Sequence, residues 1–113
     1  GEVADRYFRG EGGRYRLRED VVRSVTFRRH DLLRESPPGE FDLVLCRNTA
    51  FTYFAVPRRI ALASAIAAAV PPGGCLVLGR TEKLPREAAD WFFRTCPPYN
   101  IFRRPESVDT VRD

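Results

Sequence analysis

The 113-residue sequence contains no methionine, a single histidine and a single lysine, Lys83. Because position 1 is a glycine, we expect that the chain as given does not begin where translation begins. The lone His30 has no partner at metal-ligand spacing, and Cys46, Cys75 and Cys96 form no Cys-x-x-Cys pair. We therefore expect neither a metal site nor a cysteine nucleophile. The lack of a disulfide framework favours a reducing cytoplasm as the location.

Long apolar runs are also missing. The longest one ends at Pro71-Pro72 and falls well short of the roughly 20 residues that a membrane helix needs. The charged N-terminal residues do not resemble a secretory signal. With 43% hydrophobic residues, the chain is long enough and apolar enough for one soluble globular domain, and we expect no membrane insertion.

Charge of one sign is not concentrated anywhere. The net charge is +4, and 18 of the 19 basic residues are arginines. Arginines beside aromatic residues, as at Tyr7-Phe8-Arg9 and Tyr15-Arg16, would suit the stacking of nucleic-acid bases. However, the 15 acidic residues are interspersed among the arginines, and abundant alanine points to a compositional bias of the genome. We do not expect nucleic-acid binding.

The residues that are present predict alternating strands and helices. Gly10, Gly12 and Gly13 favour a flexible turn or short hairpin, because no buried strand precedes them as in a phosphate-binding loop. The first expected element is a short strand that begins at Val25-Thr26-Phe27, with the loop that leaves it ending at Asp31-Leu32-Leu33. The elements expected after it, in chain order, are a strand over Phe41–Cys46 buried on both faces, a helix from Pro57 to about Val70, a strand over Cys75–Leu78, a short helix from Pro85 to about Phe93, a strand over Tyr99–Phe102 and a frayed polar tail.

This order predicts an α/β fold with mostly parallel strands and flanking helices. Ligands of such sheets bind beyond the carboxyl ends of the strands. Two polar pairs lie at such ends, Asp31-Leu32 and Arg47-Asn48. We expect a functional site there.

Five strings of residues match a known family in their order and spacing. They are Val25-Thr26-Phe27 with Asp31-Leu32-Leu33, Phe41-Asp42-Leu43-Val44-Leu45-Cys46-Arg47-Asn48 with Tyr53-Phe54, Pro72-Gly73-Gly74, Leu78-Gly79-Arg80-Thr81-Glu82-Lys83-Leu84, and Tyr99-Asn100-Ile101-Phe102-Arg103-Arg104. In these strings the chain resembles the CheR-type methyltransferases, which use S-adenosylmethionine and whose best-known members methylate glutamates of chemotaxis receptors.

The resemblance implies a partial Rossmann-like methyltransferase sheet and roles for five residues. Asp31 and Leu32 match the positions that contact the adenine, and Arg47 and Asn48 match the loop that meets the body of S-adenosylmethionine. Tyr53 matches a tyrosine close to the transferring methyl and the acceptor carboxylate, so it is the expected catalytic residue. The methyl acceptor would be a protein carboxylate or a small molecule. Without the resemblance, simpler structural roles are open: Asp31 could cap a turn, the Arg47-Asn48 pair could hydrogen-bond the loop backbone, and Tyr53 could belong to the core.

Two departures qualify the carry-over. Four residues separate Asn48 from Tyr53 where the family usually has three, so Phe51 or Thr52 could take the tyrosine's place. The family's first strand, its cofactor loop and its ribose-binding acidic residue have no counterpart in residues 1–113. We therefore expect this chain to be the C-terminal part of the domain and inactive alone. The alternative is a non-catalytic interaction module derived from the same fold, with an exposed sheet edge.

Two further residues follow the strand at Cys75–Leu78. Arg80 and Glu82 could face the substrate, but the sequence favours a salt bridge on the surface.

Overall fold

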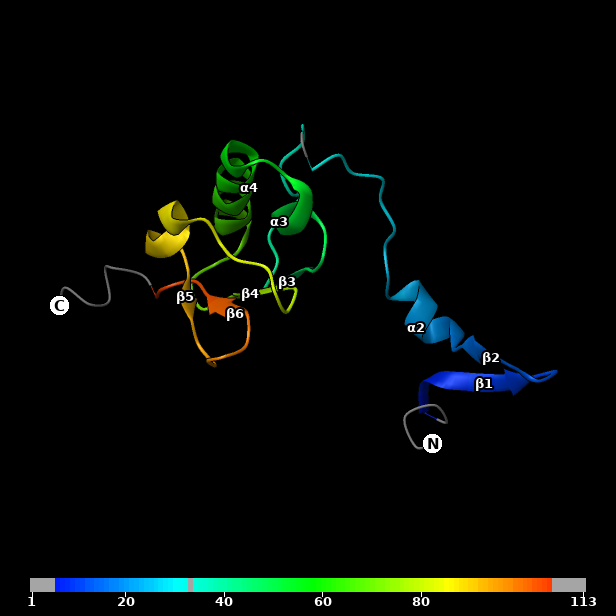
Figure 1. Ribbon diagram of the computed structural model, residues 1–113. Helices are drawn as coiled ribbons and strands as arrows, with labels where there is room; N and C mark the ends of the chain where they lie inside the picture. The colour runs from blue at the N-terminus through cyan, green and yellow to red at the C-terminus, as the bar shows by residue number, and fades with distance from the viewer. Residues whose placement is uncertain (1–5, 33, 107–113) are drawn as a thin grey trace. The chain divides into compact units, whose positions relative to one another are not determined.

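The computed structural model describes residues 6–32 and 34–106, shown in Figure 1. The chain divides into two compact units, residues 1–30 and residues 31–113. Leu33, at the end of the first expected strand, and the polar tail from residue 107 onward lie outside the described residues.

The first unit contains a β-hairpin. Strands β1 (Phe8–Glu11) and β2 (Arg14–Leu17) pair antiparallel, with Glu11 opposite Arg14. The two loop residues, Gly12 and Gly13, have φ angles of 55° and 80°. Positive φ at both loop positions is the requirement of the tight turn whose twist matches the flanking strands, and glycine meets it without steric cost. The predicted hairpin is confirmed. A short helix, α2 (Glu19–Arg23), follows it.

The prediction of a strand that begins at Val25-Thr26-Phe27 is wrong. Residues 25–30 have no regular secondary structure, and the Phe27 side chain is 87% exposed. β-branched and aromatic residues favour a strand, but a strand forms only where a neighbour takes up its backbone hydrogen bonds. Among the described residues, no strand pairs with this segment.

The second unit is built on a four-stranded sheet. Its strands are β3 (Leu43–Cys46), β4 (Cys75–Leu78), β5 (Phe93–Arg94) and β6 (Ile101–Arg103), in the order β3-β4-β6-β5. The β3–β4 pair is parallel, whereas β4–β6 and β5–β6 are antiparallel. The α/β class is confirmed, but the expectation of mostly parallel strands is not, because the chain reverses between β5 and β6 and β6 therefore runs antiparallel to both of its neighbours.

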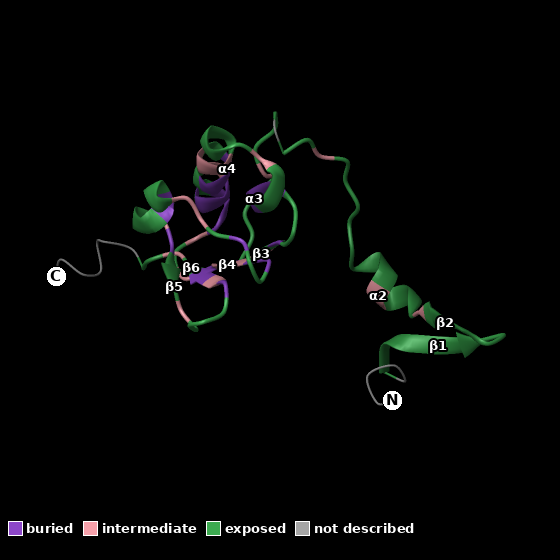
Figure 2. Cartoon of the chain, in the orientation of Figure 1, coloured by how far each residue is buried: buried purple, intermediate pink, exposed green. Residues whose placement is uncertain are grey.

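The crossover between the two parallel strands is helical, as the sequence predicts. It contains α3 (Ala50–Tyr53) and the longer α4 (Val56–Ala69), which has Pro57 in its first turn. Helix α4 covers one face of the sheet, and Figure 2 shows the buried residues of α4 on the side toward β4. Buried side chains of α4, β4 and β6 belong to one core cluster. The core includes Leu62, Ile66, Leu76 and Phe102.

In the part of the chain that the structure describes, the other face of the sheet is exposed at β3, and we call it the open sheet face. In β3, Leu43 and Leu45 are 56% and 65% exposed, while Val44 and Cys46 point toward the core. The prediction that this strand is buried on both faces is therefore wrong. A continuous apolar run is buried on both sides only where helices cover both faces of the sheet.

The remaining elements differ from their predictions in detail. A 3₁₀ helix, η1 (Arg86–Asp90), replaces the short helix expected from Pro85 to Phe93, and Phe93 belongs to β5. Phe92 is buried, as expected, and Trp91 is half-buried beside it. Within residues 6–32 and 34–106, no helix is long and apolar enough to cross a membrane.

Candidate functional site

The carboxyl ends of β3 and β4 lie side by side. The two strands are parallel, and their last residues, Cys46 and Leu78, are paired in register. Consequently the loop that begins at Arg47 and the loop that begins at Gly79 emerge at the same edge of the sheet. Such an edge is where open α/β sheets place their ligands.

Asn48 turns the chain sharply as it leaves β3. Its φ angle is 56°, in the left-handed region that asparagine tolerates better than most residues. Asn48 and Arg47 are both exposed, so their side chains are available to a ligand at this edge. The backbone N–H of Asn48, by contrast, donates a hydrogen bond of 2.8 Å to the carboxylate of Glu82.

The carboxylate of Glu82 joins the two loops. One oxygen, Oε1, accepts from the backbone N–H of Asn48 and, at 2.6 Å, from the backbone N–H of Gly79. The other, Oε2, accepts from the hydroxyl of Thr52 at 2.7 Å. Glu82 is only 4% exposed, so these bonds form largely away from water. The predicted surface salt bridge is wrong: the side chain points inward.

This environment lowers the pKa of Glu82. Burial disfavours the charged carboxylate and acts to raise the pKa. The hydrogen bonds from the Thr52 hydroxyl and from the backbone of Asn48, Gly79 and Thr49 act in the opposite direction and outweigh burial. Glu82 is therefore ionised at neutral pH and places a negative charge beneath the two loops.

Gly79 makes this arrangement possible. A Cβ at this position would clash with the side-chain oxygen of Asn48 and would lie 2.6 Å from Glu82 Oε1. Both distances are too short for carbon against oxygen, so any larger residue would push the two loops apart.

Asn100 closes the second loop from below. Its amide nitrogen donates to the carbonyl oxygens of Gly79 at 2.7 Å, Glu82 at 2.8 Å and Arg80 at 3.3 Å. The residue is 9% exposed and precedes β6. The antiparallel return of the chain thus fixes the loop that carries Glu82.

Helix α3 presents its residues in three different directions. Phe51 is 2% exposed and belongs to the core, Thr52 is bound to Glu82, and Tyr53 is 79% exposed. A core role for Tyr53 is therefore excluded, and Phe51 is not available to replace it at a ligand site.

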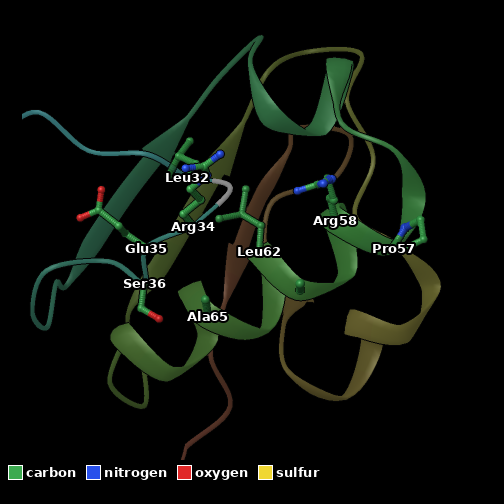
Figure 3. Close-up of a pocket in the computed structure, with 9 residues that line it drawn as sticks. Leu32, Arg34, Glu35, Ser36, Pro57, Arg58, Leu62 and Ala65 are labelled. Carbon is green, nitrogen blue, oxygen red and sulfur yellow. The ribbon is translucent and has the colours of Figure 1, made fainter.

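Asp31 and Leu32 occupy a different turn. The backbone carbonyl of Asp31 accepts hydrogen bonds from the N–H groups of Arg34 and Glu35. Leu32 lines a groove of about 480 Å³ between this turn and the side of α4 that carries Pro57, Leu62 and Ala65 (Figure 3). The groove's lining among the described residues includes neither Arg47 nor Asn48. The structure thus brings Arg47 and Asn48 together at the sheet edge and places Asp31 and Leu32 on the separate turn.

Sequence reasoning missed the residues that support the loops. Gly79 and Asn100 were not predicted to take part, Thr52 was considered only as a replacement for Tyr53, and Glu82 was expected on the surface. One signal was available: Gly79 ends a buried strand at the same sheet edge as Asn48. In the part of the chain that the structure describes, no group of three or more His, Cys, Asp or Glu side chains could hold a metal ion.

The fold and the site define an α/β domain with polar loops gathered at the ends of two parallel strands. The family described as "CheR methyltransferase, SAM binding domain" matches residues 1–99. Chemotaxis protein methyltransferase 1 of Pseudomonas aeruginosa is 34% identical over 104 residues, which cover 90% of this chain and 38% of that protein. Chemotaxis protein methyltransferase 1 of Vibrio cholerae is 33% identical over 92 residues, 80% of this chain and 33% of that protein.

An uncharacterized 104.1 kDa protein of Rhodobacter capsulatus is 38% identical over 80 residues, which cover 71% of this chain and 8% of that protein. The chain thus spans about a third of the length of these two chemotaxis methyltransferases. It belongs to the CheR methyltransferase SAM-binding-domain family, and the cofactor is S-adenosyl-L-methionine.

Proposed function

We propose that this chain forms the C-terminal part of the cofactor-binding domain of a CheR-type O-methyltransferase whose acceptor is a carboxylate of a protein. The observation that carries the proposal is the left-handed turn at Asn48, fixed by Glu82 and exposed at the sheet edge. A small-molecule carboxylate is the second acceptor class, and the acceptor screen described below separates the two.

The residues at this edge fit the cofactor by their chemistry. The Arg47 guanidinium is always charged and can form a bidentate pair with a carboxylate such as that of the methionyl group. The Asn48 amide can both donate and accept, as ribose hydroxyls or a ring nitrogen require. On the separate turn, Leu32 lines a groove together with Ala61 and Leu62, which suits an aromatic base, and Asp31 directly precedes it in the chain.

The proposed methyl transfer needs positioning of the two reactants and no acid–base chemistry from the protein. When bound, the cofactor supplies an electrophilic methyl group on a sulfonium. A carboxylate acceptor is already ionised at neutral pH, so no general base is needed. The residues act by holding the two reactants in line, which can lower a barrier by about 7–11 kcal/mol. We assign the exposed Tyr53 to the acceptor side, where its hydroxyl would hydrogen-bond the carboxylate.

Among the described strands, β3 and β4 are the one neighbouring pair that is parallel, so a single pair of adjacent carboxyl ends is available to a cofactor. The matched relatives are about three times as long as the region that they share with this chain. We therefore propose that the 113-residue chain binds the cofactor incompletely and does not turn over alone.

Calorimetric titration with S-adenosylhomocysteine tests the proposal. Asn48→Ala and Arg47→Ala should each weaken binding, whereas Arg86→Ala, which removes an exposed arginine from η1, should not. A screen of the longer protein that contains this region, with labelled cofactor and with protein or small carboxylate acceptors, identifies the acceptor class. Binding unaffected by Asn48→Ala and Arg47→Ala would refute the assignment of the site. Methyl transfer by the isolated chain would refute its incompleteness.

The open sheet face favours a second candidate, a non-catalytic interaction module. Only one edge of β3 is paired among the described residues, and Leu43 and Leu45 are exposed next to it. An unpaired edge beside an apolar face invites a strand from another polypeptide. This candidate predicts self-association in sedimentation and no cofactor binding at millimolar ligand. A monomer whose melting temperature rises with S-adenosylhomocysteine would exclude it.

A further inference from the structure

We propose that Glu82 is a positioning residue: its buried carboxylate fixes the backbone of Asn48 and thereby aims the Arg47-Asn48 turn at the cofactor. The inference deepens the proposed function and rests on it. Glu82 itself would not touch the cofactor, because both of its carboxylate oxygens already accept hydrogen bonds from the protein.

The geometry supports control of the turn by this carboxylate. A single oxygen, Oε1, accepts from the N–H of Asn48 and from the N–H of Gly79, so the two loops are tied to one point. Asn48 has a φ angle of 56°, a conformation that a non-glycine residue keeps only where its surroundings hold it. The hydrogen bond to its N–H is the contact that holds the turn from the side of β4.

The carboxylate is itself held on three sides. The Thr52 hydroxyl binds Oε2, and Asn100 donates to the backbone carbonyl of Glu82. The backbone N–H of Gly79 donates to Oε1 at 2.6 Å, an approach that is possible only because this residue has no Cβ. A charged group that is buried, fully hydrogen-bonded and confined in this way suits the precise orientation of a neighbouring exposed turn.

Two variants separate positioning from simple support of the fold. Glu82→Gln retains an oxygen that can accept from both backbone N–H groups, and its amide can donate to Thr52, so the fold should persist while the charge is lost. Thr52→Val keeps the shape of an exposed residue and removes one hydrogen bond from the carboxylate. Thr81→Val, at an exposed threonine one residue before Glu82, is the matched control.

The first measurement follows the backbone amide proton resonances of Asn48 and Gly79 by NMR as the pH is lowered. In the wild-type chain we expect both resonances to move together with one apparent pKa, and we expect neither to move in this way in Glu82→Gln. Independent titration of the two amides, or the same titration in Glu82→Gln, would overturn the bridge.

The second measurement is the dissociation constant for S-adenosylhomocysteine. Thr52→Val should weaken binding by about tenfold, the equivalent of one hydrogen bond to a charged group, and Thr81→Val should leave it unchanged. As the pH is lowered, the wild-type affinity for S-adenosylhomocysteine should decrease with the same apparent pKa as the shifts of the two amide resonances. This pH dependence should be absent in Glu82→Gln.

The outcomes distinguish the two proposals. If the amides titrate together but the wild-type chain does not bind the ligand, the proposed function fails and the role of Glu82 in fixing Asn48 stands. If the wild-type chain binds and Thr52→Val and Glu82→Gln retain its affinity and pH dependence, the positioning role fails.

Discussion

Gly79→Ala is the substitution for which the structure gives the sharpest expectation. The added Cβ would lie 2.6 Å from Glu82 Oε1 and 3.0 Å from the backbone nitrogen of Asn48, and would clash with the Asn48 side-chain oxygen. Favourable contacts of carbon begin at about 3.5 Å. The Asn48 side chain is exposed and can swing away, but the Glu82 carboxylate is buried and tied to both loops. The two loops must therefore separate.

The cost has two parts. Overpacking by a methyl group typically costs about 1–3 kcal/mol. Displacement of the carboxylate weakens its hydrogen bonds to the Asn48 and Gly79 N–H groups, which adds about 1 kcal/mol. We expect a total of about 3 kcal/mol, a large share of the roughly 5–15 kcal/mol that stabilise a folded domain.

Urea unfolding followed by the fluorescence of Trp91, the single tryptophan, measures this loss. With a slope of about 1–3 kcal/mol per molar urea, the midpoint should fall by between about 1 and 3 M. Gly10→Ala is the matched control, because no atom lies within 4 Å of a Cβ at Gly10. A Gly79→Ala midpoint equal to that of the control would refute the reasoning.

Three further predictions concern the second unit. The pKa of Glu82 is lowered in the folded state, so the stability that its carboxylate contributes is complete above the unfolded-state pKa of about 4.3. That stability is lost as the pH falls through the folded-state pKa. Urea midpoints measured between pH 7 and pH 3 should therefore fall less in Glu82→Gln than in wild type. Leu45→Thr, on the open sheet face, should change stability by less than about 0.5 kcal/mol and reduce self-association in sedimentation velocity. Arg104→Ala should cost about 1–2 kcal/mol in urea unfolding, because the guanidinium donates to the carbonyls of Val70 and Trp91; a midpoint equal to wild type would contradict that.

Elements with local signals could be predicted from the sequence. The strand over Cys75–Leu78 is observed with the predicted bounds, and α4 ends at Ala69, one residue before the prediction. Pro57 fits the first turn of the helix, and Pro71 stops its continuation, so both ends are marked by nearby residues.

Elements that depend on distant partners could not be predicted from the sequence. Val25-Thr26-Phe27 has the composition of a strand, but the sequence does not reveal that the described chain holds no neighbour for it. For the same reason the burial of Leu43 and Leu45 was overestimated, since their pattern would suit a sheet covered on both sides. The antiparallel direction of β6 depends on a tight return of the chain and leaves no mark in its own residues.

The candidate site likewise contains residues that local patterns predict and one residue that depends on distant contacts. Arg47 and Asn48 follow directly after a strand in a distinctive string, so their place at the sheet edge could be expected. The role of Glu82 depends on hydrogen bonds to residues 30 and 34 positions earlier in the chain. Separations of that size are outside the reach of local patterns, and a lone glutamate after a strand is most often a surface residue.

The extra residue between Asn48 and Tyr53 affects these two positions differently. Asn48 is fixed from the opposite loop by Glu82, so an insertion after it leaves its turn in place. Thr52 is the second anchor of the segment, and Phe51 before it is locked in the core. Tyr53, the first residue beyond this anchor, is 79% exposed. We infer that the cofactor side of the site tolerates this insertion and that the acceptor side is where this chain differs from relatives with the shorter spacing.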